Sequence, residues 1–437
     1  MPDEPKTLDP AARPATTTVP AATTTPPGAA VAGDSPARAR AQRWTLGLVT
    51  VGLVLAALNL RPAITSLGAL LEEVSADLHM SGTVAGVLTS VPPLCFAIFG
   101  ITAPRLARRF GPAAVVCAGM AAIFTGLLLR PFAGGTVGFL AASALALMGI
   151  AVSNVLMPVI VKRYFPDRIG SMTGLYSMAL ALGTSVAAAA TVPMTAALGG
   201  DWRIGLGVWA AIAALAVLPW IPLVRDRDRA PREARTATAV TETAAPRITR
   251  SRTAWALGCY FGLQATGAYI TMGWMPQIFR DAGVPASTAG VLLAVTMVMG
   301  VPLAFVIPRL ATRMKNQGPI VVALGLCGLA GYTGLFLAPA AGAWVWALLL
   351  GVSNCSFPLA LTMIGMRSRT GAGVVRLSAF AQSVGYLISI PGPLLVGVLY
   401  QHSGGWGLPI VLMGGLMVPQ MIVGTLAGRD RTVEDES

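Results

Sequence analysis

One arginine lies inside an apolar stretch, where a charged group is energetically unfavourable. Arg61 follows Asn59-Leu60 and precedes Pro62, within residues 44–71. A guanidinium near a bilayer centre costs at least about 2.5–3.5 kcal/mol, and such groups usually face a bundle interior or a wet cavity. A guanidinium also offers two parallel N–H donors to a small planar acceptor. We therefore expect Arg61 to contact an anionic or strongly polar substrate; the alternative is that backbone carbonyls hold it, or that it extends towards Glu72.

Other polar and aromatic side chains lie at plausible depth in other apolar stretches. Asn154 and Asn354 occupy corresponding places in two stretches, each followed four residues later by a proline. Two amides facing each other across a cavity could hydrogen-bond a ligand, although Asn also joins helices in membranes. The further candidates for a substrate site are Asn59, Tyr176, Gln264, Tyr269, Gln382 and Tyr386.

The apolar stretches lack the residues that catalysis or metal binding requires. They contain no Asp or Glu, and the two histidines, His79 and His402, fall in predicted loops. The five cysteines have no metal-ligand spacing. We expect no enzyme, no catalytic residue, no metal and no cofactor. A coupling proton would have to travel with the substrate, because no embedded carboxylate can relay it.

The composition indicates a protein that lives in a lipid bilayer. Of the 437 residues, 55% are hydrophobic and 11% are charged, against roughly 25% charged in soluble domains. Apolar stretches of about 20 residues, the length that spans a bilayer, alternate with short charged loops. The net charge of +13 could suggest nucleic acid as a partner, but the basic residues lie in these loops, where they set topology. We expect no nucleic-acid partner.

Twelve apolar stretches are expected to be transmembrane helices: 44–71, 82–103, 112–130, 136–161, 169–197, 203–224, 253–279, 285–307, 318–338, 341–366, 374–400 and 406–428. The domain boundaries that follow are a disordered cytoplasmic tail 1–43, a six-helix half 44–224, a cytoplasmic linker 225–252, a second six-helix half 253–428 and a cytoplasmic tail 429–437.

The distribution of Lys and Arg predicts the orientation. Almost all of them fall on the side of the two termini, whereas the other side holds only Arg130, Arg203 and Arg280. Because cytoplasmic loops carry the excess of Lys and Arg, both termini should be cytoplasmic. The protein is expected to be a multi-pass protein of the cytoplasmic membrane.

The two halves repeat each other in sequence. Residues 104–107 (Pro-Arg-Leu-Ala) recur at 308–311, and the Val-Ser-Asn of 152–154 recurs at 352–354. Six helices separate the copies, so the halves are parallel repeats related by an axis along the membrane normal. The expected fold is an all-α membrane protein with twelve transmembrane helices in two six-helix pseudo-repeats, the architecture of the major facilitator fold.

Two basic loops could form a gate. Arg105 and Arg109 follow the second helix of the first half, and Arg309 and Arg313 follow the second helix of the other half. They could stabilise one conformation of a transporter, or they could only obey the positive-inside rule.

Three motifs resemble the cyanate permease and 2-nitroimidazole transporter family of the major facilitator superfamily. They are residues 59–66 (Asn-Leu-Arg-Pro-Ala-Ile-Thr-Ser), 157–163 (Met-Pro-Val-Ile-Val-Lys-Arg) and 174–177 (Gly-Leu-Tyr-Ser). The resemblance covers residues 44–428 and implies passage of small, compact, often planar solutes. Pro104 and Pro308 stand where the superfamily's loop motif has an Asp, so a gate that relies on that carboxylate is not expected.

The expected function is secondary active or facilitative transport of a small polar or anionic solute such as cyanate, by alternating access between the halves. The alternative is efflux of small neutral compounds of the 2-nitroimidazole type. We expect a monomer whose partners are the solute, the bilayer and, where transport is coupled, protons. A membrane enzyme or a receptor is disfavoured, since the tails and linker indicate no folded output domain.

Overall fold

The computed structural model describes residues 36–225 and 248–436, and these residues are helical without a β-strand. The first half holds α1 (Pro36–Asn59), α2 (Pro62–Ala69), α3 (Leu71–Asp77), α4 (Gly82–Phe110), α5 (Pro112–Leu129), α6 (Thr136–Tyr164), α7 (Ile169–Ala197), α8 (Trp202–Val217) and α9 (Trp220–Arg225). The second half holds α10 (Arg252–Asp281), α11 (Ala286–Val298), α12 (Gly300–Arg313), α13 (Gly318–Leu337), α14 (Ala343–Ser353), α15 (Ser356–Met366), α16 (Gly371–Ser389), α17 (Pro391–Ser403) and α18 (Gly407–Ala427). Short 3-10 turns are η1 (Arg130–Phe132), η2 (Pro166–Arg168), η5 (Ile248–Arg250) and η6 (Val433–Glu436).

These helices account for all twelve predicted spans. Within the described residues, ten helical segments are long and apolar enough to cross a membrane. The sixth span is the shorter apolar helix α8 continued by α9, and the seventh is α10, which is 30 residues long. The all-α, twelve-helix expectation is confirmed.

Several spans consist of two helices rather than one. α1 gives way to α2 at Arg61, α14 to α15 at Asn354, and α16 to α17 at Ile390. Pro62 and Pro391 begin the second helix of their spans, where the missing N–H of proline does no harm. At two of these positions the second helix begins with a proline of the sequence.

The tails and the linker are described only in part. α1 begins at Pro36, inside the segment predicted to be disordered, and the C-terminal segment contains η6. Residues 1–35 and 226–247 lie outside the described residues, so the predicted boundaries of the tail and the linker remain predictions.

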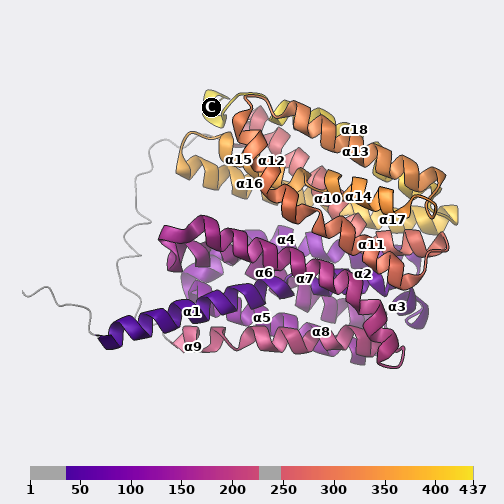
Figure 1. Cartoon of the computed structure of the whole chain (residues 1–437), viewed down its shortest axis with the longest axis horizontal. Coiled ribbons are helices and arrows are strands. Elements are labelled where there is room, and N and C mark those ends of the chain that lie inside the picture. Colours follow the sequence, from indigo (N-terminus) through magenta and orange to yellow (C-terminus); the bar gives the residue numbers. More distant parts are fainter. Residues whose placement is uncertain (1–35, 226–247, 437) are drawn as a thin grey trace, which may run out of the picture. The chain divides into compact units, whose positions relative to one another are not determined.

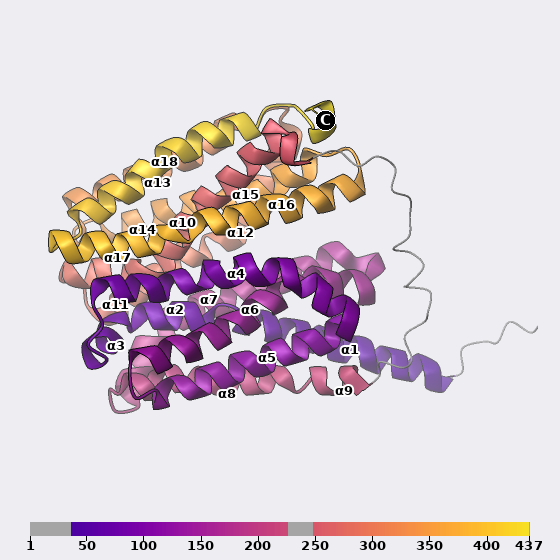
Figure 2. The same ribbon diagram turned by 180° about the vertical axis from the view of Figure 1, so that it is seen from behind.

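The halves are built alike. In the first half α5 packs against α6 and α8, and in the second half α13 packs against α14 and α18. In Figures 1 and 2 the first half, indigo to magenta, lies on one side, and the second, salmon to yellow, lies on the other. They meet mainly through α2 with α10, α4 with α17, and α7 with α11. The last two pairs correspond, since each joins the second span of one half to the fifth span of the other, as parallel repeats require.

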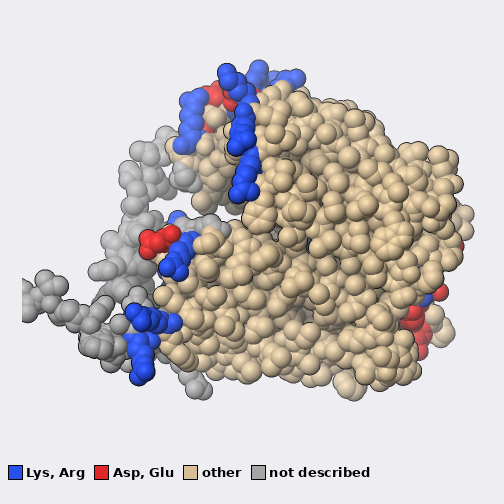
Figure 3. All heavy atoms as spheres, in the orientation of Figure 1, with Lys and Arg blue, Asp and Glu red and all other residues tan. Residues whose placement is uncertain are grey.

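The molecule has two chemically different ends. One, here called the acidic end, is where α2 leads into α3 and where α10 finishes; its charged residues are Glu72, Glu73, Asp77, Asp201, Arg203, Arg280 and Asp281. The other, the basic end, includes the ends of α4, α6, α12 and α15 and carries most of the Lys and Arg side chains. Figure 3 shows most of the basic groups on one flank, with a few acidic groups among them, and a smaller, mainly acidic group on the opposite flank.

Candidate functional site

A central cavity of about 460 Å³ lies between the halves. Its walls come from α7 of the first half and from α10, α11, α12, α15 and α16 of the second. Arg61 and Tyr269 lie at its inner part, whereas Thr173, Pro308 and Thr362 lie near the basic ends of their helices. The cavity therefore extends from Arg61 towards the basic end.

Arg61 lines this cavity from the break between α1 and α2. Its side chain is half-buried, and within residues 36–225 and 248–436 it forms no ion pair with a carboxylate. The hydroxyl groups of Tyr269 and Tyr386 are close enough to interact electrostatically with the guanidinium of Arg61. A cation in a cavity without a protein counter-ion is available to a ligand.

An aromatic cluster from both halves holds the guanidinium in place. The Arg61 Cζ lies 6.0 Å from the ring centroid of Phe96 on α4. Phe96 stacks on Tyr386 with 5.0 Å between ring centroids, and Phe261 meets Tyr386 edge-on at 5.3 Å. Ring faces attract cations by about 0.5–2 kcal/mol, so the cluster orients Arg61 without neutralising it. Phe96 was not among the expected residues, because one Phe in an apolar helix carries no distinguishing signal.

Gln264 and Asn354 add polar groups to the same cavity. Gln264 is buried on α10, and its Oε1 has no hydrogen-bond partner among the described residues. Asn354 lies between α14 and α15, where its backbone carbonyl accepts a bond from Phe357 N. Both also border a small polar pocket with Ser356 and Gln420. The predicted residues Arg61, Gln264, Tyr269, Asn354 and Tyr386 thus meet around one cavity.

The other predicted substrate residues do not line this cavity. Asn59 is buried, and its Nδ2 donates to the carbonyls of Leu55 and Ile212, so it joins α1 to α8. Gln382 donates to Ser378 Oγ on its own helix. Asn154 lies in the unbroken helix α6 and Tyr176 lies on α7, both half-buried. Their roles in substrate binding stay predictions. Asn154 lies inside a continuous helix, whereas Asn354 lies at a break between two helices and lines the cavity.

The four predicted gate residues are exposed at the basic end. Arg309 donates to the carbonyl of Phe305 on its own helix, and Arg109 lies over the ring of Phe110. Arg105 and Arg313 are exposed on α4 and α12. Gating by these four residues stays a prediction.

The acidic end is closed by polar bonds between the halves, which the sequence did not reveal. Arg280 on α10 forms two hydrogen bonds of 2.9 Å to Glu73 on α3 and an ion pair of 2.9 Å with Glu72. On the same side Thr83 N and Oγ1 donate to Gln401 Oε1 at 2.9 and 2.7 Å. The clue in the sequence is the Glu72-Glu73 pair directly after the first span, but its partner lies more than 200 positions away.

Glycine contacts bring the helices together beneath these bonds. A Cβ at Gly68 on α2 would lie 2.1 Å from the carbonyl oxygen of Met272 on α10. A Cβ at Gly273 would lie 2.8 Å from Thr89 Cγ2 on α4. A side chain at Gly68 would meet the backbone of α10, and one at Gly273 would meet the Thr89 side chain, so both glycines favour the closed packing of the acidic side.

The sequence places Arg130 at the last residue of the third predicted span, on the side opposite the termini, and the structure shows that it is fully buried. It begins the turn η1, and its Nε donates to Ser143 Oγ while its Nη1 donates to the carbonyl of Ala63. The sequence does not show whether a residue at the end of an apolar stretch is exposed or buried, because only the tertiary fold decides whether other helices cover it. Arg61 is therefore not the only arginine inside the helix bundle.

Two six-helix halves around a central, mostly apolar cavity define a membrane transporter. The chain belongs to the Major Facilitator Superfamily, which it matches over residues 49–389. It is 36% identical to an uncharacterized transporter, YycB, of Bacillus subtilis, over 87% of this chain and 94% of that protein. It is 30% identical to the 2-nitroimidazole transporter of Escherichia coli (88% and 96% covered) and 30% identical to the cyanate transport protein CynX of Escherichia coli (84% and 94%).

Solved structures agree on the fold. The inward open xylose transporter XylE of E. coli superposes with a TM-score of 0.68 at 13% identity, covering 87% of this chain and 95% of that one. A bacterial homologue of the lysosomal transporter Spinster, inward-facing and occupied, gives 0.67 at 16% identity, covering 91% and 96%. The resemblance to the cyanate and 2-nitroimidazole transporters is confirmed, and the protein is a multi-pass membrane transporter of a small solute.

Proposed function

We propose that the protein carries a small planar anion of the cyanate type through the central cavity by alternating access. The observation that carries this proposal is Arg61, a cation that lines the cavity without a carboxylate partner among the described residues. An anion bound there would supply the missing counter-charge. The similarity to a cyanate transport protein supports the same substrate class.

The surrounding groups suit a small planar solute. Gln264 and Asn354 offer amide donors and acceptors on the second half, opposite Arg61 of the first half. A solute that bridges these groups would draw the halves together, and such differential contact is what alternating access needs. Tyr269 and Tyr386 would provide hydroxyl donors beside the guanidinium.

We propose that the basic end faces the cytoplasm, because most Lys and Arg residues lie there. In that orientation both termini are cytoplasmic, and the cavity opens inward. Arg105, Arg109, Arg309 and Arg313 would approach the opposite half only when the basic end closes. The protein is proposed to work as a monomer, since each chain contains both halves of the cavity.

A second candidate is efflux of a neutral planar compound such as a nitroimidazole. A cavity of about 460 Å³ is within the range of roughly 300–1,000 Å³ typical for drug-sized ligands. The rings of Phe261 and Tyr386 could stack on a heteroaromatic solute, with Arg61 as donor to a neutral acceptor. The similarity to a 2-nitroimidazole transporter supports this candidate.

Counterflow of labelled cyanate into proteoliposomes tests the first candidate. We expect transport by the wild type, loss of at least about tenfold in Arg61→Gln, corresponding to ~1.4 kcal/mol or more, and partial retention in Arg61→Lys. Lys315→Gln is the matched control, because it removes an exposed charge at the basic end. Full transport by a folded Arg61→Gln variant would make Arg61 structural. No wild-type counterflow of cyanate, with export of 2-nitroimidazole, would establish the second candidate instead.

The charge of the substrate separates the candidates further. Transport of a weak-acid anion should weaken as pH falls and the substrate is protonated, whereas transport of a neutral compound should not. Imposing a pH gradient on the same vesicles tests coupling, and uptake that ignores the gradient would exclude proton symport.

A further inference from the structure

Arg130 is a buried cation with an unused donor. Its side chain is fully buried, with Nε bonded to Ser143 Oγ and Nη1 to the Ala63 carbonyl, both at 2.9 Å. Its Nη2 has no hydrogen-bond partner among the described residues. Phe139 lies against the guanidinium at 5.6 Å, and no carboxylate pairs with it in the part of the chain that the structure describes. A buried guanidinium with an open donor and no counter-ion is unfavourable unless something else satisfies it.

A small cavity of about 10 Å³ adjoins this residue. That volume is roughly the minimum for one water molecule. It is lined by α2, α4, α6 and α10 as well as by Arg130, and Tyr269 borders both this cavity and the central one. Arg130 is thus separated from the Arg61 cavity by a tyrosine that both cavities share.

The small cavity lies on the side of Arg61 that is closed. Its other walls include Gly68, Thr89 and Gly273, where α2, α4 and α10 pack closely against one another. α2 runs from Arg61 towards the acidic end, and Gly68 is near its last turn. When the acidic end opens, α2 and α4 must separate from α10, and this cavity must widen.

We infer that Arg130 forms a second binding station for a small monovalent anion, on the acidic side of the central site. The station rests on the proposed anion transport and adds a step to it: the anion passes between Arg130 and Arg61 along Tyr269. In the closed state the cavity is too small for a three-atom anion, so the station is usable only while the acidic end is open. The bond from Nη1 to Ala63, two residues after Arg61, fixes the two guanidinium groups to one turn of α2.

Charge-selective labelling at Thr89 tests the station without using a transport substrate. Thr89→Cys is a small change on the cavity wall. Its reaction with sulfonatoethyl (anionic) and trimethylammonium-ethyl (cationic) methanethiosulfonate is followed in proteoliposomes by mass spectrometry of the peptide that carries residue 89. Glu73→Gln is added to favour opening of the acidic end. We expect the ratio of the labelling rate with the anionic reagent to that with the cationic reagent to fall at least about fivefold in Arg130→Gln. In Arg130→Lys, which keeps the positive charge, the ratio should stay near the wild-type value.

Two controls distinguish a local anion site at Arg130 from a purely structural role of Arg130 and from a general electrostatic effect of its charge. Ser143→Ala removes a partner of Arg130 but leaves its charge, so it should not change the ratio even if it lowers the unfolding temperature. Thr83→Cys lies on the same helix nearer the acidic end, and its ratio should not depend on Arg130. An unchanged ratio in Arg130→Gln, an equal fall at Thr83, or a Thr89→Cys that reacts with neither reagent would overturn the inference.

Protection by cyanate then identifies the occupant. Cyanate should slow labelling of Thr89→Cys when Arg130 is present and should not when it is Gln. Charge-selective labelling without cyanate protection would overturn cyanate as the occupant of this station, whereas failure of cyanate counterflow would overturn cyanate as the transported substrate. The two failures are therefore distinguishable.

Discussion

The acidic end and the basic end of the transporter are stabilised in different ways. At the acidic end the polar bonds cross between the halves: Arg280 bonds to Glu73, and Thr83 to Gln401. These groups are partly exposed; the side chain of Arg280 is 15% exposed and that of Glu73 34%. Exposed ion pairs contribute about 0–1 kcal/mol each, so this closure can be broken and remade.

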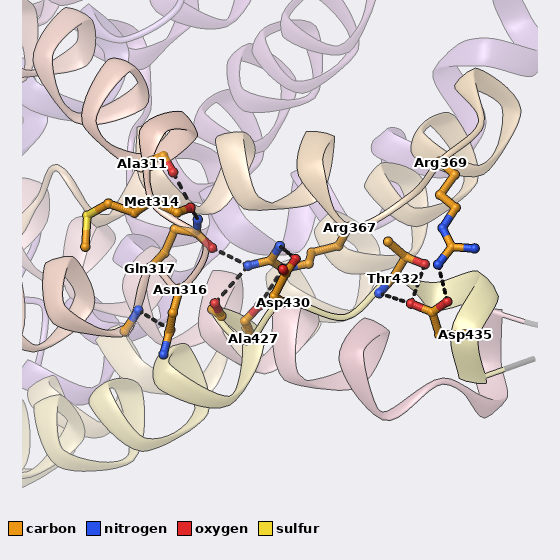
Figure 4. A network of polar contacts seen from close by, with 12 residues as sticks. Ala311, Met314, Asn316, Gln317, Arg367, Arg369, Ala427, Asp430, Thr432 and Asp435 are labelled. Carbon is orange, nitrogen blue, oxygen red and sulfur yellow. Dashed lines mark hydrogen bonds and ion pairs between the residues drawn. The ribbon is translucent and has the colours of Figure 1, made fainter.

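At the basic end the described bonds tie the second half to itself. Arg367, just after α15, donates to the carbonyls of Ala427 and Gly428 at the end of α18 and to Gln317 before α13. Figure 4 shows this network together with the neighbouring contact of Arg369 with Asp435. Glu436 bonds to Ser251 and Thr253 at the start of α10, and Glu434 bonds to Ser368.

The difference suggests how rigidity and motion are divided. Strong, buried bonds join helices that must move together, whereas weaker, partly exposed bonds join the halves that must separate. A transporter that rocks between two states needs both kinds of contact, because a ligand shifts an equilibrium only by its differential affinity for the two states. Each of the following substitutions alters the contacts at one of the two ends, and so tests this difference between them.

The largest effect is expected from Arg367→Met at the basic end. Three buried acceptors would lose their donor, which should destabilise the protein by about 2–4 kcal/mol. Thermal unfolding in detergent measures this effect. Arg369→Met is the control, since its side chain is 65% exposed and should matter little. Equal unfolding temperatures for the two variants would contradict the assigned role of the network.

Gly68→Ala should prevent the acidic end from closing normally. The added Cβ would lie 2.1 Å from the Met272 carbonyl oxygen, and such overpacking costs typically 1–3 kcal/mol, about 5- to 150-fold in the equilibrium. Because only the closed acidic side contains this contact, counterflow should slow and labelling from that side should rise. Gly415→Ala makes the same change where nothing lies within 4 Å. Normal transport by Gly68→Ala would show that this contact is not needed for the cycle.

Glu73→Gln should shift the same equilibrium by a smaller amount. The bidentate bond to Arg280 would lose its charge, and we expect a shift of about 0.5–1 kcal/mol towards opening of the acidic end. The readout is the labelling rate of a cysteine at position 89. Asp77→Asn is the matched control, because Asp77 pairs with Arg203 at 2.7 Å within the first half and should leave the equilibrium unchanged. A similar shift in both variants would indicate a general charge effect.

The smallest effect is a pH dependence at the basic end. Partial burial works against ionisation of Glu436, but hydrogen bonds from Thr253 N and from the Ser251 and Thr253 hydroxyls outweigh it and hold its pKa below 4.5. A carboxyl with a lowered pKa contributes stability above its unfolded pKa, and this stability is lost as pH falls through the folded pKa. Since the group is half-buried at the surface and screened by solvent, the contribution should stay under about 1 kcal/mol. The unfolding temperature should decline below about pH 4.5 in the wild type, and less in Glu436→Gln. Identical pH profiles would contradict this assignment.

The helices and part of the cavity could be predicted because their signals are local. A run of about 20 apolar residues has one stable arrangement in lipid, so the twelve spans follow from hydropathy. Arg61, Gln264 and Asn354 were recognisable because polar groups are costly in such runs. Phe96 and the glycines at 68 and 273 were not, because apolar and small residues are common in every span.

The sequence by itself determined the membrane class, the twelve spans and the presence of Arg61 within the bundle, since each follows from the exclusion of polar groups from hydrocarbon. It also determined the repeated halves, because short motifs recur at nearly constant spacing. Only the tertiary structure decided that Arg130 is buried, that Arg280 meets Glu73, and that Asn354 but not Asn154 lines the cavity. Burial and pairing depend on which helices lie side by side, and that depends on packing between residues far apart in the chain.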